Sequence, residues 1–262
     1  MGSAKEIVLR PITHQEADVI VRRFHYSGKV KPNSQFHIGV YYQGRLEGAM
    51  QFGPSVDKRR MQGLIKDTPW NGFIELNRMA FSDALPRNSE SRALGIAMRI
   101  LRSHAPHVQW VVSFADGAQC GDGTIYRASG FVLTSIKKNN SIWKASNVGI
   151  VSRTTVTKGN DAARGGGGAS MKQYKDAGFT PIPGFQLRYI FFLDPTARDR
   201  LTVPILPFSE IKRRGAGMYK GQSCATSIEG NAPAIHAGEG GAVPTVALQL
   251  TEDANTPEQL NQ

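Results

Sequence analysis

The order strand, helix, strand over residues 73–115 constrains the fold of this chain most. Residues 73–81 and 108–115 have the length and apolar content of strands, whereas residues 89–104 place apolar side chains at helical spacing. Because a helix separates the two strands, we expect them to lie parallel in one sheet. Such sheets bind ligands at the carboxyl ends of their strands, so functional residues are expected there.

The segments on either side extend the same sheet. They alternate between strand-type and helix-type patterns, and no internal repeat divides them. We therefore expect one α/β domain, in which helices flank a single mixed sheet. The further strands are expected at residues 7–13, 36–42, 46–52, 131–136 and 186–193, a helix at 14–24, a short helix just before Gly130, and a basic surface loop at 57–60.

The distribution of charge separates a basic body from an acidic tail. All 32 Lys and Arg residues lie in the first 220 residues, whereas five of the 21 acidic residues follow them. The body therefore has a net charge of +16, from 32 basic and 16 acidic residues. From residue 214 the chain is poor in large apolar side chains, which is typical of disorder. We expect a folded domain over residues 1–213 and a disordered, low-complexity acidic tail over residues 214–262.

Such a basic body favours a polyanionic partner, of which nucleic acid is the first candidate. A charge that serves only solubility is the alternative. No apolar run is long enough to cross a membrane, and neither a secretory signal nor a cysteine framework is present, which favours the cytoplasm. The side chains expected to contact phosphates form four clusters: Arg22 with Arg23, Lys29 with Lys31, Lys58 with Arg59 and Arg60, and Lys137 with Lys138.

Polar side chains interrupt the first of the two parallel strands and follow the second. Glu75, Asn77 and Arg78 lie in a strand that is expected to be central, so they must find partners or face a cleft. Asp116 directly follows the second strand, at the edge of the sheet that binds ligands. Its alternative role is to cap the helix that follows.

The loop at residues 85–92 joins the first parallel strand to its helix and has features of a phosphate site. A helix N-terminus presents unpaired backbone amides and a partial positive charge to an anion. A well-capped surface helix is the alternative, because no glycine-rich fingerprint is present. The side chains that would add donors are Arg87, Ser89, Ser91 and Arg92.

Two further positions are expected near the same edge. Tyr126 lies on the short helix before Gly130, where it would either donate a proton to a leaving group or pack as a half-buried aromatic. His25, followed by Tyr26, ends the helix at 14–24, and a histidine there can act as a base or a metal ligand. Taken alone, a histidine in this position is more often structural.

Taken together, the elements resemble the core of the GNAT acyltransferase superfamily. The shared order is strand, phosphate-type loop, helix, second strand, and then a helix with the pattern Tyr-x-x-x-Gly-Phe. In that superfamily the loop holds the pyrophosphate of acetyl-coenzyme A, and the matching tyrosine often protonates the departing thiolate. The loop here, Arg-Asn-Ser-Glu-Ser-Arg at residues 87–92, departs from the usual Gln/Arg-x-x-Gly-x-Gly/Ala pattern.

A narrower set of motifs is similar to the Mom family of phage DNA-modification proteins. This resemblance runs from about residue 14 to residue 207 and leaves the tail outside. The motifs that carry it are His25-Tyr26-Ser27, Glu75-Leu76-Asn77-Arg78, Leu85-Pro86-Arg87-Asn88, Ser113-Phe114-Ala115-Asp116 and Gln186-Leu187-Arg188-Tyr189.

The resemblance to Mom implies a transferase that converts adenine in DNA to N6-carbamoylmethyl-adenine, which protects phage DNA from host restriction. It also implies double-stranded DNA as the partner, acetyl-coenzyme A as the donor, and a ferrous ion with His25 and Asp116 as candidate ligands. The choice between a monomer and a homodimer stays open. The residues to which the resemblance assigns the activity are His25, Tyr26, Arg78, Asp116 and Tyr126, together with Ser91.

Two other functions are alternatives. A conventional GNAT N-acetyltransferase for a small amine or a protein has the same order of elements, but usually carries the glycine-rich loop that is missing here. A non-enzymatic DNA-binding protein accounts for the charge, but does not need polar groups gathered at strand ends. An enzyme that acts on adenine must take the base out of the duplex. Either Asp116 or His25 would then accept the proton of its amine, while Tyr126 serves the leaving group.

Overall fold

The structure is a computed structural model. It describes residues 2–117, 121–140, 142–145, 149–152, 175–176, 178–219 and 222–223. The chain divides into two units, Met1–Ala225 and Thr226–Gln262, and the second lies outside the described residues. The first unit continues beyond residue 213, with Ala216 and Met218 buried. Most of the segment that we predicted to be a disordered tail lies outside the described residues.

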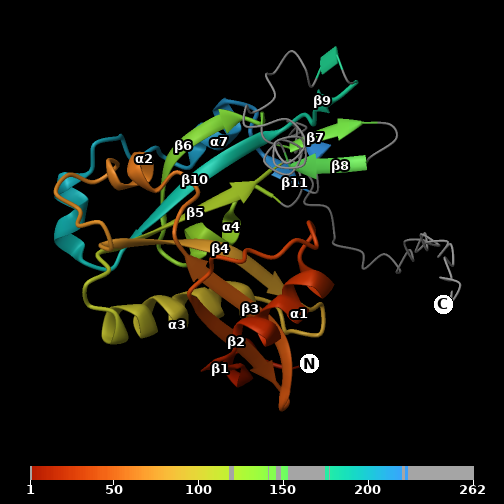
Figure 1. The fold of residues 1–262 in the computed structure, drawn as a ribbon, viewed down its shortest axis with the longest axis vertical. Helices are drawn as coiled ribbons and strands as arrows, with labels where there is room; N and C mark the ends of the chain where they lie inside the picture. The colour runs from red at the N-terminus through yellow and green to blue at the C-terminus, as the bar shows by residue number, and fades with distance from the viewer. Residues whose placement is uncertain are drawn as a thin grey trace, which may run out of the picture. The chain divides into compact units, whose positions relative to one another are not determined.

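A seven-stranded mixed sheet forms the centre of the first unit (Figure 1). Its strand order is β1-β2-β3-β4-β5-β10-β6, and the β4–β5 pair is parallel while the other neighbours are antiparallel. This arrangement confirms the predicted mixed sheet and the parallel pairing across the long helix. The strands are β1 (Val8–Pro11), β2 (Phe36–Tyr42), β3 (Arg45–Gly53), β4 (Phe73–Phe81), β5 (Trp110–Asp116), β6 (Val132–Lys138) and β10 (Phe185–Phe192).

Helices and short strands complete the described part of the unit. One small sheet has the order β8-β7-β9, and a second joins β11 to β12. No described helix combines the length and the apolar character that crossing a lipid bilayer requires. The elements are η1 (Ala4–Glu6), α1 (His14–Phe24), α2 (Lys58–Gln62), α3 (Ser89–His104), α4 (Thr124–Ala128), β7 (Ile142–Ala145), β8 (Gly149–Ser152), β9 (Thr180–Pro181), η2 (Pro195–Arg200), α7 (Ser209–Arg213), β11 (Met218–Tyr219) and β12 (Gln222–Ser223).

The helices α1 and α3 lie on opposite faces of the sheet (Figure 1). Thr13 caps α1 by accepting a hydrogen bond from the backbone of Glu16, and the apolar stripe of the helix packs on Ala49 and Ala80. The apolar stripe of α3 packs instead in the cluster that contains Met50. Ala49, which packs with α1, and Met50, which packs with α3, are consecutive in β3. Because consecutive residues of a strand point to opposite faces of the sheet, the two helices lie on opposite faces. We call the face under α1 the α1 face and the other the α3 face.

The strands β4 and β5 diverge toward their carboxyl ends. Their parallel pairing covers Phe73–Glu75 on β4 and Trp110–Val112 on β5. Beyond it, β4 stays paired with β3 and β5 with β10. The register of β3 with β4 shifts at Asn77, which stands as one extra residue on β4. Such a bulge bends and twists its strand, so it re-aims the side chains next to it. The two strands therefore separate at the edge where we expected a ligand, and a bulge shapes that edge.

Residues 57–60, which we predicted to be a surface loop, begin the helix α2 instead. Asp57 caps this helix by accepting a hydrogen bond from the backbone of Arg60, and Met61 on the helix is buried. Met61, Leu64 and Ile65 pack over Trp110 on the α1 face. The sequence prediction was wrong because five residues with one apolar side chain carry almost no helical periodicity. Tertiary burial of Met61, rather than helix propensity, accounts for this element.

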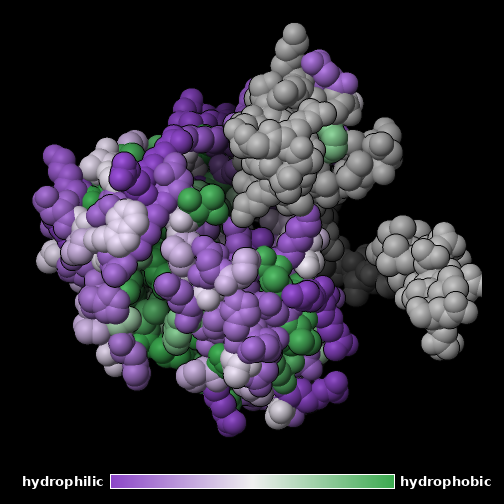
Figure 2. Space-filling view, viewed as in Figure 1, coloured by the Kyte–Doolittle hydropathy of each residue, from purple (hydrophilic) through white to green (hydrophobic). Residues whose placement is uncertain are grey.

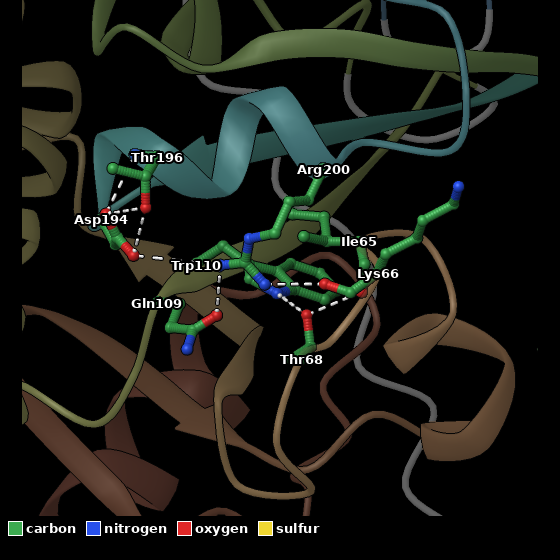
Figure 3. Close-up of polar contacts among 8 residues, drawn as sticks. All are labelled: Ile65, Lys66, Thr68, Gln109, Trp110, Asp194, Thr196 and Arg200. Atoms are coloured by element: carbon green, nitrogen blue, oxygen red, sulfur yellow. Dashed lines mark hydrogen bonds and ion pairs between the residues drawn. The ribbon is translucent and has the colours of Figure 1, made fainter.

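A polar network with a buried centre at Thr68 and Trp110 holds the segment after α2 to the sheet (Figure 3). Trp110 Nε1 donates to Thr68 Oγ1 at 3.1 Å, and that hydroxyl donates to the carbonyl of Ile65 at 2.8 Å. Arg200 on η2 donates to the carbonyl of Lys66 at 2.7 Å and to Gln109 Oε1 at 2.8 Å. The network ties residues 65–68 to the start of β5 and thereby positions α2 on the α1 face.

Replacing Thr68 with valine should destabilise the fold by about 1–3 kcal/mol, because the buried Trp110 N–H would lose its acceptor. Valine has nearly the same shape as threonine, so the loss would come from the hydroxyl rather than from a cavity. Denaturation by urea, followed by tryptophan fluorescence, measures the change. Thr68→Ser keeps the hydroxyl and should retain most of the stability. Equal stability of Thr68→Val and the unmodified protein would refute this account of the network.

Candidate active site

Tyr26 and Asp116 meet at the carboxyl end of β5, on the α1 face. The Tyr26 hydroxyl donates a hydrogen bond to Asp116 Oδ2 at 3.3 Å, although the two residues lie 90 positions apart in the chain. Asp116 is 8% exposed, whereas Tyr26 is 49% exposed. The ring of His25 stacks on that of Tyr26, with centroids 4.3 Å apart. Three of the residues that the sequence singled out therefore form one cluster.

Arg78 joins this cluster from β4, next to the bulge. Its Nε donates to the carbonyl of Lys29 at 2.8 Å, and its Nη1 donates to the carbonyl of Asn77 at 2.7 Å. Burial lowers the pKa of Arg78, and the proximity of Tyr26 and Glu75 opposes that shift. Arg78 thus fixes the loop that follows α1, and with it His25 and Tyr26, over the diverging strands.

His25 is held neutral at ordinary pH. Burial and, to a smaller degree, the positive charge of Arg78 lower the pKa of His25 to about 3. The backbone N–H of Ser27 donates to His25 Nδ1 at 3.2 Å, and the Ser27 hydroxyl lies 2.8 Å from the same nitrogen. Because Nδ1 accepts, the neutral ring carries its proton on Nε2. His25 is therefore arranged to donate a hydrogen bond from Nε2 rather than to accept a proton there.

Glu75 and Asn77, which we expected either to find partners or to face a cleft, have partners. The Ser55 hydroxyl donates to Glu75 Oε2 at 2.5 Å, and the Ser34 hydroxyl donates to Asn77 Oδ1 at 3.2 Å. Burial raises the pKa of Glu75, while Lys31 and Arg78 act in the opposite direction. Both side chains are buried, and they connect β4 to the segments at residues 34 and 55. They support the site, whereas Arg78 is part of it.

Tyr126 lies on the α3 face, opposite to Tyr26. The Ser113 hydroxyl donates to the Tyr126 hydroxyl at 2.8 Å, and the ring of Tyr126 stacks on Tyr189 at 5.1 Å. Ser113 and Asp116 are three residues apart in β5, so their side chains point to opposite faces. The structure thus places Tyr126 on the α3 face of the diverging strands and the other candidate catalytic residues on the α1 side.

The start of α3 lines a pocket of about 710 Å³. The residue before the helix, Asn88, has a left-handed backbone and no side chain capping the helix, and the Ser89 N–H donates to the carbonyl of Pro86 at 3.1 Å, so the backbone amides of Glu90 and Ser91 are the ones open to a ligand among the described residues. Gly95 also lines the pocket, and a Cβ built there would meet no atom within 4 Å. A glycine inside a helix lowers the stability of the fold by roughly 0.5–1 kcal/mol relative to alanine, so leaving this space open is destabilising.

Basic side chains surround this pocket. Three of the four predicted cofactor-binding residues line it, while Ser89 is only 1% exposed and its hydroxyl contacts no partner among the described residues. Sequence analysis missed Lys5 and Arg99. Arg99 follows Arg92 by seven positions on α3, a spacing that would have revealed it, whereas no pattern links Lys5 to the site. The lining residues are Gly2, Ser3, Ala4, Lys5, Arg87, Asn88, Ser91, Arg92, Gly95, Arg99, Ala128 and Ser129.

The comparisons with known proteins bear on this arrangement. The model of the Mom protein family matches residues 6–210. This chain belongs to the Mom family. It is 34% identical over 205 residues to "Methylcarbamoylase mom" of Escherichia phage Mu, which covers 77% of this chain and 82% of that protein.

Solved structures of acetyltransferases are also similar. A putative GNAT-family acetyltransferase from Desulfovibrio desulfuricans shares 11% identity, covers 71% of this chain and 99% of its own, and gives a TM-score of 0.39. Arabidopsis thaliana NAA60 with a bisubstrate analogue shares 11% identity, covers 71% and 97%, and gives 0.43. The GNAT-like order of elements that the sequence predicted is present in this member of the Mom family.

The described residues do not fit a resident ferrous ion. They contain no group of three or more His, Cys, Asp and Glu side chains placed to hold a metal. Non-haem iron sites use two histidines and a carboxylate, and the resemblance offered His25 and Asp116 alone. His25 Nδ1 is moreover occupied as an acceptor for Ser27. No step of the mechanism below runs through a metal.

The predicted DNA-contacting clusters lie at four places in the fold, and the face seen in Figure 2 is mostly hydrophilic. Arg22 and Arg23 are exposed on the last turn of α1, and Lys137 and Lys138 are exposed at the end of β6. The other two clusters lie on the loop after α1 and on α2. In the loop, the backbone carbonyl of Lys29 accepts a hydrogen bond from Arg78, and Lys31 is close enough to Glu75 to affect the pKa of that carboxyl. On α2, the Lys58 ammonium donates to Asn71, and Arg59 and Arg60 are exposed.

Proposed function

We propose that this protein is a transferase that converts adenine in DNA to N6-carbamoylmethyl-adenine and so protects phage DNA from host restriction. The observation that carries the proposal is the Tyr26–Asp116 pair at the diverging ends of β4 and β5, in a chain of the Mom family. The name of the phage Mu relative, a methylcarbamoylase, supports the type of group transferred.

In this proposal Asp116 accepts the proton of the adenine amine. That amine is a poor nucleophile, so catalysis depends on positioning and on a base within hydrogen-bond reach. Sequence analysis left the choice between Asp116 and His25 open, and the hydrogen bond from Ser27 to His25 Nδ1 favours Asp116. Tyr26 orients the carboxylate, and His25 positions the ring of Tyr26 by stacking on it. Arg78 holds the loop that carries both residues.

Acetyl-coenzyme A is the proposed donor, and the pocket at the start of α3 fits its phosphates. Open backbone amides, the positive end of the helix dipole and the Arg87 and Arg92 side chains all favour bound phosphate. Bound acetyl-coenzyme A would supply the two-carbon unit: an ammonia-level nitrogen donor would displace its thiolate to form the amide, and joining the methyl carbon to N6 of adenine would take a two-electron oxidant as co-reactant. Tyr126, whose oxygen accepts from Ser113, would donate its proton to that thiolate from the α3 face.

Double-stranded DNA is the proposed partner, and the bacterial cytoplasm is where the protein would meet it. Chemistry on a base requires that the nucleotide leaves the helix, which costs a few kcal/mol. Contacts from the basic clusters to phosphates offset that cost and make binding dependent on salt. A homodimer is the proposed assembly to test against a monomer by sedimentation velocity.

Mass spectrometry of nucleosides tests the proposed function directly. Plasmid DNA from cells that express the protein should contain an adenosine species with the added mass of a carbamoylmethyl group. Plasmid from cells with Asp116→Ala, expressed to the same level, should lack it. An added mass of acetyl instead would identify a conventional acetyltransferase. Unmodified adenosine beside abundant folded protein would contradict the proposal.

Replacing Arg92 with alanine should weaken coenzyme A binding by roughly 10- to 150-fold, the effect of losing a hydrogen bond to a charged group. Titration calorimetry with coenzyme A measures the dissociation constant. Arg198, an exposed arginine on η2 outside the pocket, provides the control through Arg198→Ala. Gly95→Gln should also weaken binding, because its side chain would project into the open space of the pocket. Unchanged affinity in both pocket variants would exclude this pocket as the cofactor site.

A further inference from the structure

Phe114 is exposed in the middle of the sheet. It lies in β5, two residues beyond the last residue that pairs with β4 and opposite Arg188 of β10, and 42% of the residue is accessible. Its neighbours in the strand, Ser113 and Ala115, are 1% and 6% exposed. A large aromatic side chain on a central strand normally belongs to the core, so its exposure gives up part of the stabilisation that burial would provide.

The segment around Met61 and Ile65, which packs over β5 on the α1 face, ends just before Phe114. Trp110, Val112 and Phe114 alternate along β5 and therefore share this face. The first two pack with Met61 and Ile65 in a buried cluster, whereas Phe114 is left open to solvent. On the other side, the Tyr26–Asp116 pair begins only two residues further along β5. The Phe114 side chain thus lies on the sheet between the segment that packs over Trp110 and Val112 and the proposed catalytic carboxylate of Asp116.

The surroundings of Phe114 are basic. Arg188 on β10 is its direct partner across the strands, so the two side chains lie side by side on the α1 face. Arg188 donates from Nε to Thr134 Oγ1 at 3.0 Å and from Nη2 to the carbonyl of Thr134 at 3.3 Å, which fixes its guanidinium. Burial lowers the pKa of Arg188, and the charge of Arg60 on α2 lowers it further, so a second cation lies close to Arg188.

We propose that Phe114 is the platform on which the extruded target base stacks, with Arg188 and Arg60 binding the phosphates beside it. This inference rests on the proposed function and adds the residues that hold the substrate. An aromatic floor and fixed cations suit an unpaired nucleotide, because the base offers a π-face and its phosphates offer negative charge. Asp116 lies on the same face roughly 7 Å further along the strand, where it would meet the amine at the edge of a stacked purine.

Binding of short single-stranded oligonucleotides tests the platform separately from the chemistry. The probes carry thymine throughout, with either one central adenine or an abasic residue at that position. The unmodified protein should prefer the adenine probe in fluorescence anisotropy. Stacking of one base on an aromatic ring is worth roughly 5- to 150-fold in affinity, so Phe114→Ala should remove a preference of that size.

Matched variants separate stacking from packing. Phe114→Tyr keeps an aromatic face and should keep the preference for adenine, whereas Phe114→Leu keeps apolar volume and should lose it. Phe208, an aromatic residue 38% exposed that contacts Arg127 on α4, is the control, and Phe208→Ala should behave like the unmodified protein. Thermal melting confirms that each variant is folded.

The outcomes distinguish this inference from the proposed function. If Phe114→Ala kept the preference for adenine, or if it lost affinity for coenzyme A instead of that preference, the stacking platform would be overturned. This would hold even if the protein modified plasmid adenine. A preference that depends on an aromatic residue at position 114 would support the platform even if the unmodified protein left plasmid adenine unchanged. In that case only the proposed chemistry would fail.

Discussion

Asp116→Asn should lower the rate of adenine modification by roughly 10²- to 10⁴-fold, which is the usual contribution of a general base. Asparagine has nearly the same shape as aspartate, and its amide oxygen can still accept the hydrogen bond from Tyr26. It cannot accept a proton from the adenine amine. The substitution therefore removes the proposed chemistry while it keeps the contact that organises the site.

The rate is measured as the accumulation of modified adenosine in plasmid DNA after induction, with equal amounts of folded protein. Asp199, an exposed carboxylate on η2, is the matched control, and Asp199→Asn should modify DNA at the normal rate. A normal rate in Asp116→Asn would mean that Asp116 is not the base. The base would then have to be sought at His25, in the tautomer that the Ser27 hydrogen bond disfavours.

The sequence predicted the part of the site that depends on strand order. A helix between two apolar segments requires parallel strands, and Asp116 directly follows the second of them, so its place at the carboxyl edge follows from chain order alone. The order of elements likewise placed Tyr126 on a short helix beside that edge. The periodicity of apolar residues and the order of the elements were sufficient to predict these two positions, because each position is set locally or by the single helical connection between β4 and β5.

The remaining features depend on contacts between distant segments. Nothing in the pattern of residues 73–81 distinguishes Arg78, which faces the site, from Glu75 and Asn77, which find buried partners. Phe114 lies in a continuous apolar run, and alternation cannot show that the cover formed by residues 57–68 ends before it. Lys5 reaches the pocket at the start of α3 from the N-terminal segment, without any motif. Each of these depends on where the covering segments end, which is a tertiary property.

The free energy of unfolding should fall as the pH is lowered from about 6.5 toward 3, and His25 should account for a large part of the fall. The ordinary histidine pKa of about 6.5 applies to the unfolded chain, whereas the fold lowers the pKa of His25 to about 3. Between these values the unfolded chain binds a proton that the folded chain does not. The contribution of His25 to stability is therefore complete above pH 6.5 and decreases by up to about 1.4 kcal/mol per pH unit below it.

Urea denaturation at a series of pH values measures this slope. His25→Gln should flatten it, whereas His107→Gln, at an exposed histidine outside the site, should leave it unchanged. His37 contributes with the same sign, since burial and the charge of His14 lower its pKa while Asp18 opposes the shift, so some slope should remain in His25→Gln. Equal slopes in His25→Gln and the unmodified protein would show that His25 is not held neutral.

The same experiment tests the role assigned to Arg78. The charge of Arg78 is the second cause, after burial, of the low pKa of His25. Arg78→Gln should therefore raise that pKa and make the pH dependence of stability less steep, in addition to loosening the loop at Lys29. If Arg78 acted only as an anchor for the loop, the variant would be less stable at every pH, with an unchanged slope. A change in slope thus separates the electrostatic effect of Arg78 on the ring stacked against Tyr26 from its mechanical effect on the loop that carries both.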